Sequence, residues 1–196
     1  MKIHRPNAPS VFLTSALLGA LTLIAGASQS ANGAQAETQP RPRRYPARAR
    51  ERIEREVGHQ LRMLPYYSVF DNLEFRVVGY RVELFGHVVR PTLKSDAAAV
   101  VKRIEGVERV DNKIEVLPLS PNDDRIRRAV YRAVYSQSAL QRYALQAVPP
   151  IHIIVKNGHV TLVGVVASEM DRNIANLQAN GVPGVFSVTN KLRVEK

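Results

Sequence analysis

The sequence contains no cysteine and no tryptophan. Without cysteine there are no disulfides, no thiolate metal ligands and no lipid-modified cysteine near the N-terminus. Any folded domain must therefore be stabilised by packing alone. Beyond residue 27, no stretch is apolar enough to cross a membrane.

Motifs for catalysis are also missing. There is no G-x-S-x-G, no H-E-x-x-H and no glycine-rich phosphate loop. The histidines at 59, 87, 152 and 159 are scattered, and we expect them on the surface. His152 and His159 could approach each other across a hairpin, but two histidines leave a tetrahedral metal ion incomplete. We predict a protein that is not an enzyme and that has no metal and no cofactor.

The first 36 residues have the order of regions found in a secretory signal peptide. Lys2 and Arg5 give a basic start, an apolar or small-residue stretch covers 11–27, and small-x-small exits end at Ala27 and Ala36. We expect residues 1–36 to be a cleaved signal peptide and the mature protein to be periplasmic. The alternative is an uncleaved anchor helix, although the apolar stretch would barely span a bilayer.

Arginine and proline alternate after the expected cleavage site. Removing Lys2 and Arg5 lowers the formal net charge only from +11 to +9. A Pro/Arg segment cannot bury apolar area, so we expect residues 37–50 to be an extended, solvated linker. Its charge indicates an anionic surface such as phospholipid or another anionic envelope polymer, not nucleic acid, as the partner of an exported protein. The candidate contacts in this segment are Arg41, Arg43, Arg44 and Arg48; the alternative is a solubilising linker.

The rest of the chain contains one pattern twice. V-E-L-F-G at 82–86 returns as V-T-L-V-G at 160–164, and in each copy a Gly-Val pair and an alternating strand follow at the same spacing. Such a duplicated register indicates one small fold used twice. We expect domains at 51–117 and 123–196, joined by a linker at 118–122.

Each copy is expected to be an α+β domain of order α-β-β-α-β, a three-stranded sheet covered by two helices. Apolar residues spaced by four predict the first helix of each copy; they are Ile53, Val57 and Leu61, then Ile126, Val130 and Val134. Asn157-Gly158 predicts a tight hairpin, for which the first copy has Gly79-Tyr80-Arg81. A glycine inside a strand, as at Gly86 and Gly164, indicates a bulge or a close backbone approach.

The second helix of each copy has a less regular pattern. In the first copy we expect Leu93, Ala97, Val100, Val101 and Ile104 to be buried. In the second we expect Met170, Ile174 and Leu177 to face the sheet, after an N-terminal cap at Ser168. These registers do not superimpose at an offset of 78, so the two helices are expected to pack differently.

An apolar cluster of Tyr66, Tyr67, Val69 and Phe70 lies between the first helix and the first strand. Aromatic residues near strands usually pack, so we expect the cluster in the core. If exposed, it would be a docking patch for a partner or for the other unit.

Together these motifs resemble the BON domain. The V-x-L-x-G strand, the G-V-x-x-V-x-N-x-[IL]-x-V ending and the preceding amphipathic helix occur in both copies, over residues 48–196, although the first copy departs at 79–81. An exported chain with tandem copies resembles the OsmY-like periplasmic members. The resemblance implies anionic phospholipid binding and support of envelope integrity under osmotic or other stress. It also leaves open an alternative, a periplasmic protein-interaction or chaperone-like module that binds envelope proteins.

Lipid contact is best placed on the first helix of the second copy. Arg128, Arg132 and Tyr135 recur at i, i+4 and i+7, and Tyr131 lies beside them. Arginine with tyrosine on one exposed face suits the head-group level of a membrane. We therefore expect peripheral membrane contact only. The alternative is a solvated face whose tyrosines pack against the neighbouring unit.

Overall fold

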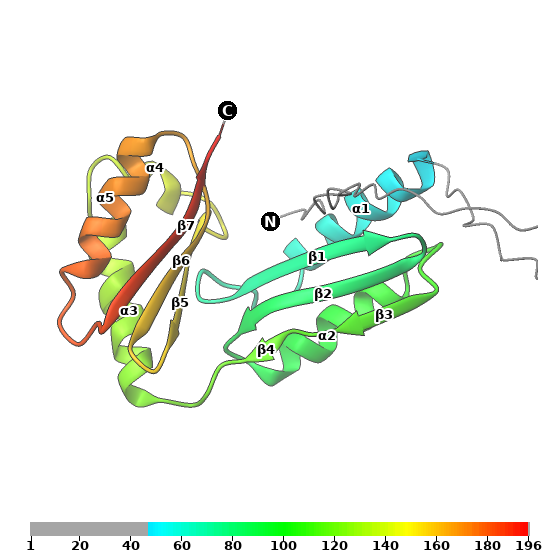
Figure 1. Ribbon diagram of the computed structural model, residues 1–196, viewed down its shortest axis with the longest axis horizontal. Helices are drawn as coiled ribbons and strands as arrows, with labels where there is room; N and C mark the ends of the chain where they lie inside the picture. The colour runs from blue at the N-terminus through cyan, green and yellow to red at the C-terminus, as the bar shows by residue number, and fades with distance from the viewer. Residues whose placement is uncertain (1–46, 196) are drawn as a thin grey trace, which may run out of the picture. The chain divides into compact units, whose positions relative to one another are not determined.

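The structure is a tandem pair of α+β domains, as predicted. The computed structural model describes residues 47–195. The first domain contains α1 (Ala47–Arg62), β1 (Asn72–Val78), β2 (Arg81–Val88), α2 (Pro91–Lys102), β3 (Arg109–Asn112) and β4 (Glu115–Val116). The second contains α3 (Pro121–Tyr135), α4 (Gln141–Ala144), β5 (Ile151–Lys156), β6 (His159–Val166), α5 (Glu169–Asn180) and β7 (Ser187–Val194), all labelled in Figure 1.

The two sheets share one topology. In each, an antiparallel hairpin is followed by a helix and by a strand that runs parallel to the second hairpin strand. Val82 is opposite Val110 in the first sheet, and Val160 is opposite Val188 in the second, so the register repeats after 78 residues. The last strand of the first sheet is interrupted and forms β3 and β4, both paired with β2.

Each sheet has its helices on one face, as Figure 1 shows for α1 and α2 and for α3 and α5. The apolar residues predicted to face inward are at most 1% exposed; they are Ile53, Val57, Leu61, Ile126, Val130 and Val134. The other face of the first sheet is polar, and Glu83 there pairs with cations that include Arg81 and Lys113. One face of that sheet is therefore packed and the other is wet.

An asparagine in the last strand fixes each second helix to its sheet. Asn112 donates from Nδ2 to the carbonyl oxygen of Lys94 at 2.8 Å, and Asn190 donates to that of Arg172 at 3.0 Å. The Oδ1 of Asn112 also accepts from the backbone N–H of Ile114, as that of Asn190 does from the N–H of Leu192. Each asparagine thus links the last strand to the second helix, and both the donor and the acceptor of its side-chain amide are hydrogen-bonded.

The first helix begins earlier than predicted. Residues 47–50 belong to α1, so the extended conformation expected for Arg48 is wrong. Alanine and arginine are good helix formers, and Arg50 also pairs with Glu54 one turn later at 2.8 Å. The other arginines of the expected linker, Arg41, Arg43 and Arg44, and the expected signal peptide lie outside the described residues.

Glycine is required at the same point of both hairpins. A Cβ on Gly86 would lie 2.0 Å from the carbonyl oxygen of Asn72, and one on Gly164 would lie 1.8 Å from that of Pro150. Their φ angles are +109° and +139°, values that residues other than glycine rarely adopt. The close backbone approach predicted from these two glycines is therefore confirmed.

The turn of the second hairpin is held by the helix that precedes it. Asn157 and Gly158 have φ angles of 53° and 78°, the pattern of a type I′ turn. Their backbone N–H groups both donate to the carboxylate of Asp123 at 2.8 Å. Asp123 is fully buried in the first turn of α3, so the helix start and the hairpin tip are one hydrogen-bonded unit.

The predicted difference in packing between α2 and α5 is wrong. The buried residues of α2 are Leu93, Ala97 and Val101, and those of α5 are Asp171, Ala175 and Ala179, at the same offset of 78. Met170 and Leu177 were expected to face the sheet but are 70% and 69% exposed. The apolar pattern predicted the wrong buried face for α5 because Asp171 occupies the position that corresponds to Leu93 in α2.

Asp171 is accommodated by a segment that the first domain lacks. The short helix α4 lies between α3 and β5, and its Tyr143 donates from Oη to Asp171 at 2.8 Å. Arg142 also pairs with Asp171, and the backbone N–H of Ala167 donates to the Tyr143 oxygen at 2.8 Å. Burial opposes ionisation of Asp171, but these hydrogen bonds and one with Ser168 outweigh it and lower its pKa.

We predict that Gly164→Ala lowers the free energy of unfolding by about 3 kcal/mol or more, because the new methyl group meets a carbonyl oxygen in a strained backbone region. Gly181→Ala is the control. Its φ is negative, and its Cβ would be 3.7 Å from the nearest atoms, so it should change stability by about 0.5 kcal/mol at most. Urea unfolding followed by circular dichroism measures both. Equal stabilities of the two variants would contradict the close approach.

We predict that Tyr143→Phe costs about 1–2 kcal/mol at pH 7, because Asp171 loses a hydrogen-bond donor in a buried place. The folded pKa of Asp171 lies below its ordinary value of 3.8, so the stabilisation is present above that value and is lost as the pH falls through the folded pKa. The cost of the substitution should therefore shrink below about pH 4. Urea unfolding of both proteins at pH 7 and pH 3 measures it; a cost independent of pH would contradict this role for Tyr143.

Candidate functional site

The segment between α1 and β1 packs against the second domain. Val69 accepts a hydrogen bond at its carbonyl oxygen from the backbone N–H of Ile153, at 2.8 Å. Its side chain is 7% exposed and belongs to the apolar cluster of the second domain, which Phe70 also contacts. The alternative interpretation of the aromatic cluster, docking to the other unit, is therefore correct for Val69 and Phe70. Tyr67 packs on the first domain's core, and Tyr66 is 70% exposed.

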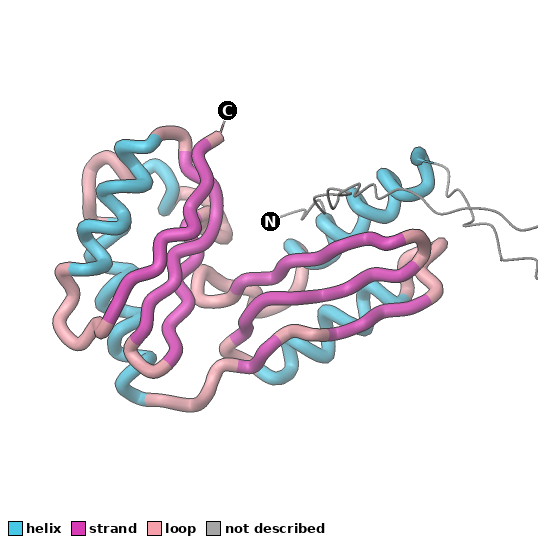
Figure 2. Tube along the Cα trace, viewed as in Figure 1, coloured by secondary structure: helices cyan, strands magenta, loops and turns pink. Residues whose placement is uncertain are grey.

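Asp71 ties this segment to the first domain through hydrogen bonds. Its carboxylate accepts from the backbone N–H of Ser68 at 3.0 Å, from the Ser68 hydroxyl at 2.7 Å and from the backbone N–H of Val89 at 2.8 Å. Figure 2 shows the stretch between α1 and β1 as a loop, without a helix or strand. The loop is thus held by side-chain hydrogen bonds at the start of the first hairpin, in a fixed position for contact with β5.

His152 lies under this segment and not on the surface, which corrects the prediction. It is 9% exposed, and its ring centroid is 5.6 Å from that of Tyr67. Burial lowers the pKa of His152 from 6.5 to about 4, although the backbone of Asp71 and Ser68 acts in the opposite direction. His152 is therefore neutral at pH 7 and packs as an aromatic residue. His159 is exposed and bonds to Ser187.

Two of the predicted lipid contacts lie together on the outer side of α3. Arg128 and Arg132 are exposed, one helical turn apart, and neither side chain has an ion pair or hydrogen bond within residues 47–195. Asp124, which lies one turn before Arg128, is paired with Arg127 instead. Two like charges spaced by four residues destabilise a helix slightly. Helix stability therefore does not explain why arginine occupies both positions.

The two predicted tyrosines differ in exposure. Tyr131 is half-buried, and its ring packs on Phe70 with centroids 6.1 Å apart and on Tyr135 at 4.8 Å. Tyr135 is only 6% exposed and donates from Oη to the carbonyl oxygen of Ile151 at 2.7 Å, so its ring cannot reach a membrane. The prediction that Tyr135 belongs to an exposed stripe is therefore wrong. Its hydroxyl is hydrogen-bonded, so it can be buried together with the ring.

A groove lies where the loop before β1 meets α3. Its volume is about 500 Å³, and we call it the junction groove. It is lined by Tyr67, Ser68, Val69 and Phe70 from the first domain and by Arg128, Tyr131, Arg132, Ala147 and Pro149 from the second. The sequence contains each aromatic residue and arginine as a separate pattern; contact between the aromatic residues of the two units was predicted only as an alternative, and a groove between them was not predicted. Aromatic walls beside two cations suit a ligand that has an anionic and an apolar part.

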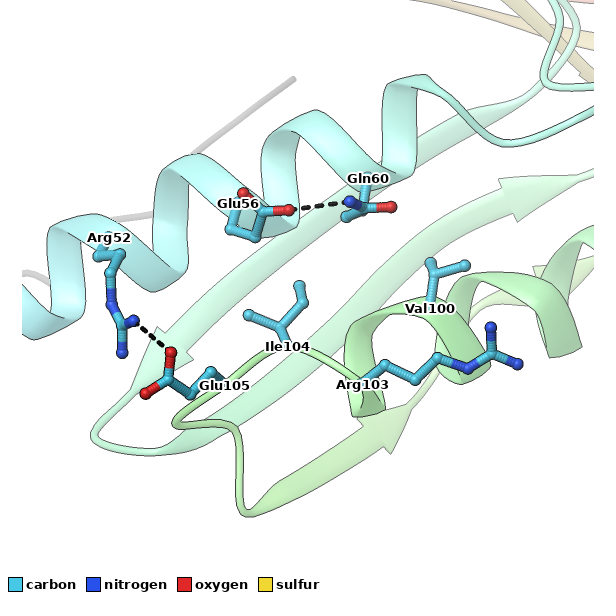
Figure 3. Close-up of a pocket in the computed structure, with 7 residues that line it drawn as sticks. All are labelled: Arg52, Glu56, Gln60, Val100, Arg103, Ile104 and Glu105. Atoms are coloured by element: carbon cyan, nitrogen blue, oxygen red, sulfur yellow. Dashed lines mark hydrogen bonds and ion pairs between the residues drawn. The ribbon is translucent and has the colours of Figure 1, made fainter.

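A second cavity, of about 430 Å³, lies between α1 and the end of α2 (Figure 3). Its polar residues are largely paired with one another. Arg52 bonds to Glu105, and Gln60 donates to Glu56, both at 2.8 Å. Because it has few unsatisfied groups, it is the weaker candidate for a site.

No metal centre or membrane span emerges from the described part of the chain. Residues 47–195 hold no group of three or more histidine, aspartate or glutamate side chains that could bind a metal ion. None of their helices is long and apolar enough to cross a membrane.

The fold and the repeated strand register show two α-β-β-α-β domains in tandem. Comparison with family models identifies the family to which these domains belong. The BON domain model matches residues 49–118 and again 122–196. The chain therefore belongs to the BON domain family, with two copies in tandem. The family is known for phospholipid binding and for osmotic-stress proteins.

Comparisons with individual proteins add little. No curated protein sequence matches the chain. Among solved structures, it is similar to CdsD, a structural protein of the type III secretion system of Chlamydia trachomatis, at 13% identity and a TM-score of 0.27, over 74% of this chain and 94% of that one. The C-terminal domain of CdsD gives 12% identity and a TM-score of 0.25, over 72% and 96%. At these scores the likeness supports no functional conclusion.

We predict that His152 makes stability depend on pH between 7 and 4. Its folded pKa is below its unfolded value of 6.5, so its neutral form stabilises the fold above 6.5 and this contribution is lost as the pH falls toward 4. The loss is about 3 kcal/mol. His152→Phe keeps an aromatic ring against Tyr67 and should remove this part of the pH dependence. Urea unfolding of the two proteins from pH 7 to pH 4 measures the difference; parallel profiles would contradict it.

Proposed function

We propose that this protein is an exported, non-enzymatic envelope protein that binds anionic phospholipid surfaces and supports envelope integrity or osmotic stress tolerance. The observation that carries the proposal is the pair of exposed arginines beside the junction groove, Arg128 and Arg132, whose side chains have no partner among the described residues. Membership in the BON family supports the same function. Export to the periplasm is part of the proposal and rests on the sequence of residues 1–36.

The arginine pair suits a phosphate-rich surface. Guanidinium groups form paired hydrogen bonds with phosphate oxygens and are weakly hydrated, so they leave water at modest cost. Each basic group near an anionic leaflet contributes about 1 kcal/mol. Arg128 and Arg132 alone would thus give weak, reversible binding. Arg48 on α1, together with Arg41, Arg43 and Arg44 outside the described residues, would add a second, less specific contact.

A protein-interaction or chaperone-like role is the second candidate. It is favoured by the exposed apolar side chains of α5, Met170 and Leu177, which lie on one side of that helix. Burial of such a surface against a protein would be driven by the hydrophobic effect and would change little with salt. Binding to anionic lipid would weaken steeply with salt, so salt dependence separates the two functions.

We predict that the protein sediments with vesicles that contain phosphatidylglycerol, not with purely zwitterionic vesicles, and that physiological salt weakens the binding relative to low salt. Arg128→Glu with Arg132→Glu should reduce binding by about 30-fold or more, since the two contributions sum to about 2 kcal/mol and the new charges repel the surface. Co-sedimentation at low and physiological salt measures both effects.

The matched control is Arg55→Glu with Lys102→Glu, two exposed residues of the first domain for which no partner is found within residues 47–195. It changes the net charge by the same amount but leaves α3 intact. Equal losses in both double variants would mean that only overall charge matters and would remove α3 from the site. No sedimentation with any vesicle would overturn the lipid function and favour a protein partner.

A further inference from the structure

We propose that the junction groove binds a single molecule of a phosphate-headed amphiphile, with the head at Arg128 and Arg132 and one alkyl chain between the aromatic walls. The inference rests on the proposed function for the nature of the head group. The inference goes beyond the proposed function because a single ligand molecule leaves the lipid surface and enters a site on the protein. Adsorption to a membrane would need only the two arginines and no cavity.

The hollow has the size and lining of a small-molecule site. Its volume of about 500 Å³ falls within the roughly 300–1,000 Å³ that such sites occupy. Phe70 and Tyr131 form one wall, with ring centroids 6.1 Å apart, and Pro149 adds apolar surface. Tyr67 also lines the groove, and burial raises the pKa of its phenol far above its usual range. These are surfaces for a hydrocarbon chain.

Charge in the groove has one sign. The residues that line it include two cations and no carboxylate. Arg128 and Arg132 have no partner among the described residues, so an anion would not have to displace an existing ion pair. A planar guanidinium binds phosphate through two parallel hydrogen bonds, and two guanidiniums one turn apart can share one head group. A neutral head would leave this charge uncompensated beside an apolar chain.

The site needs both domains. Tyr67 and Phe70 come from the loop before β1, whereas Arg128 and Tyr131 come from α3. The hydrogen bond between Val69 and Ile153 holds the two sets together. An alkyl chain bound in the groove would therefore contact both domains.

The test uses decyl phosphate below its critical micelle concentration, titrated into the full chain by calorimetry. We expect saturable binding of one molecule per chain. Inorganic phosphate and decyl glucoside, which carry only the head charge or only the tail, should bind at least 10-fold more weakly. Binding of decyl glucoside as tight as that of decyl phosphate would overturn the role of the arginines.

Ala147→Trp should fill the groove, because Ala147 lines it and is exposed, so the fold tolerates the change. Leu145→Trp is the control: Leu145 is 89% exposed and does not line the groove. We expect Ala147→Trp to weaken decyl phosphate binding at least 10-fold and Leu145→Trp to leave it unchanged. Equal effects of the two variants would place the ligand elsewhere and overturn the inference.

Vesicle binding separates this inference from the proposed function. If anionic vesicles sediment the protein but monomeric decyl phosphate does not bind, the groove is not a ligand site and the surface function stands. If neither binds, both proposals fail. Retention of vesicle binding by Ala147→Trp, together with loss of decyl phosphate binding, would support two separate modes of lipid contact.

Discussion

The backbone hydrogen bond from Ile153 to Val69 is the contact on which the candidate site depends. It places the loop before β1 along the edge of β5, where Val69 enters the apolar cluster of the second domain. This contact also covers His152 with Tyr67 and brings Phe70 against Tyr131. An unpaired strand edge is a liability, and here part of it is covered by the chain itself. The junction groove is the hollow left beside this cover.

The fold itself was largely predictable because it is encoded by local patterns that occur twice. Helical spacing identified the buried faces of α1 and α3, and Asn157-Gly158 identified the hairpin turn. Gly86 and Gly164 indicated a close backbone approach, since glycine weakens a strand and is usually found inside one where a side chain would not fit. Each of these signals depends on neighbours within a few residues, so it can be recognised without knowledge of the rest of the structure.

The errors at Asp171 and Tyr135 each involve a polar group whose partner is distant in the sequence. Asp171 takes a core position because Tyr143 and Arg142 satisfy it, and this leaves Met170 and Leu177 outside. Tyr135 is buried because Ile151 accepts from its hydroxyl. A pattern of apolar and polar residues assumes that polar groups face water, and it fails wherever the fold supplies a hydrogen bond instead. The junction groove was unpredictable for a related reason, because its walls come from two domains.

The two copies share a scaffold but differ on the outer face of the first helix. The buried residues Ile53, Val57 and Leu61 correspond to Ile126, Val130 and Val134. In that register the positions of Arg128, Tyr131, Arg132 and Tyr135 are taken in α1 by Arg55, Gly58, His59 and Arg62. The first copy therefore has cations on this face but no tyrosine or phenylalanine beside them, and its Tyr67 and Phe70, in the loop before β1, line the junction groove. A chain with two equal binding faces would keep rings and arginines together in both. Here both domains contribute aromatic walls and only the second contributes the charge, which is the arrangement expected when one site is shared between two copies of a fold.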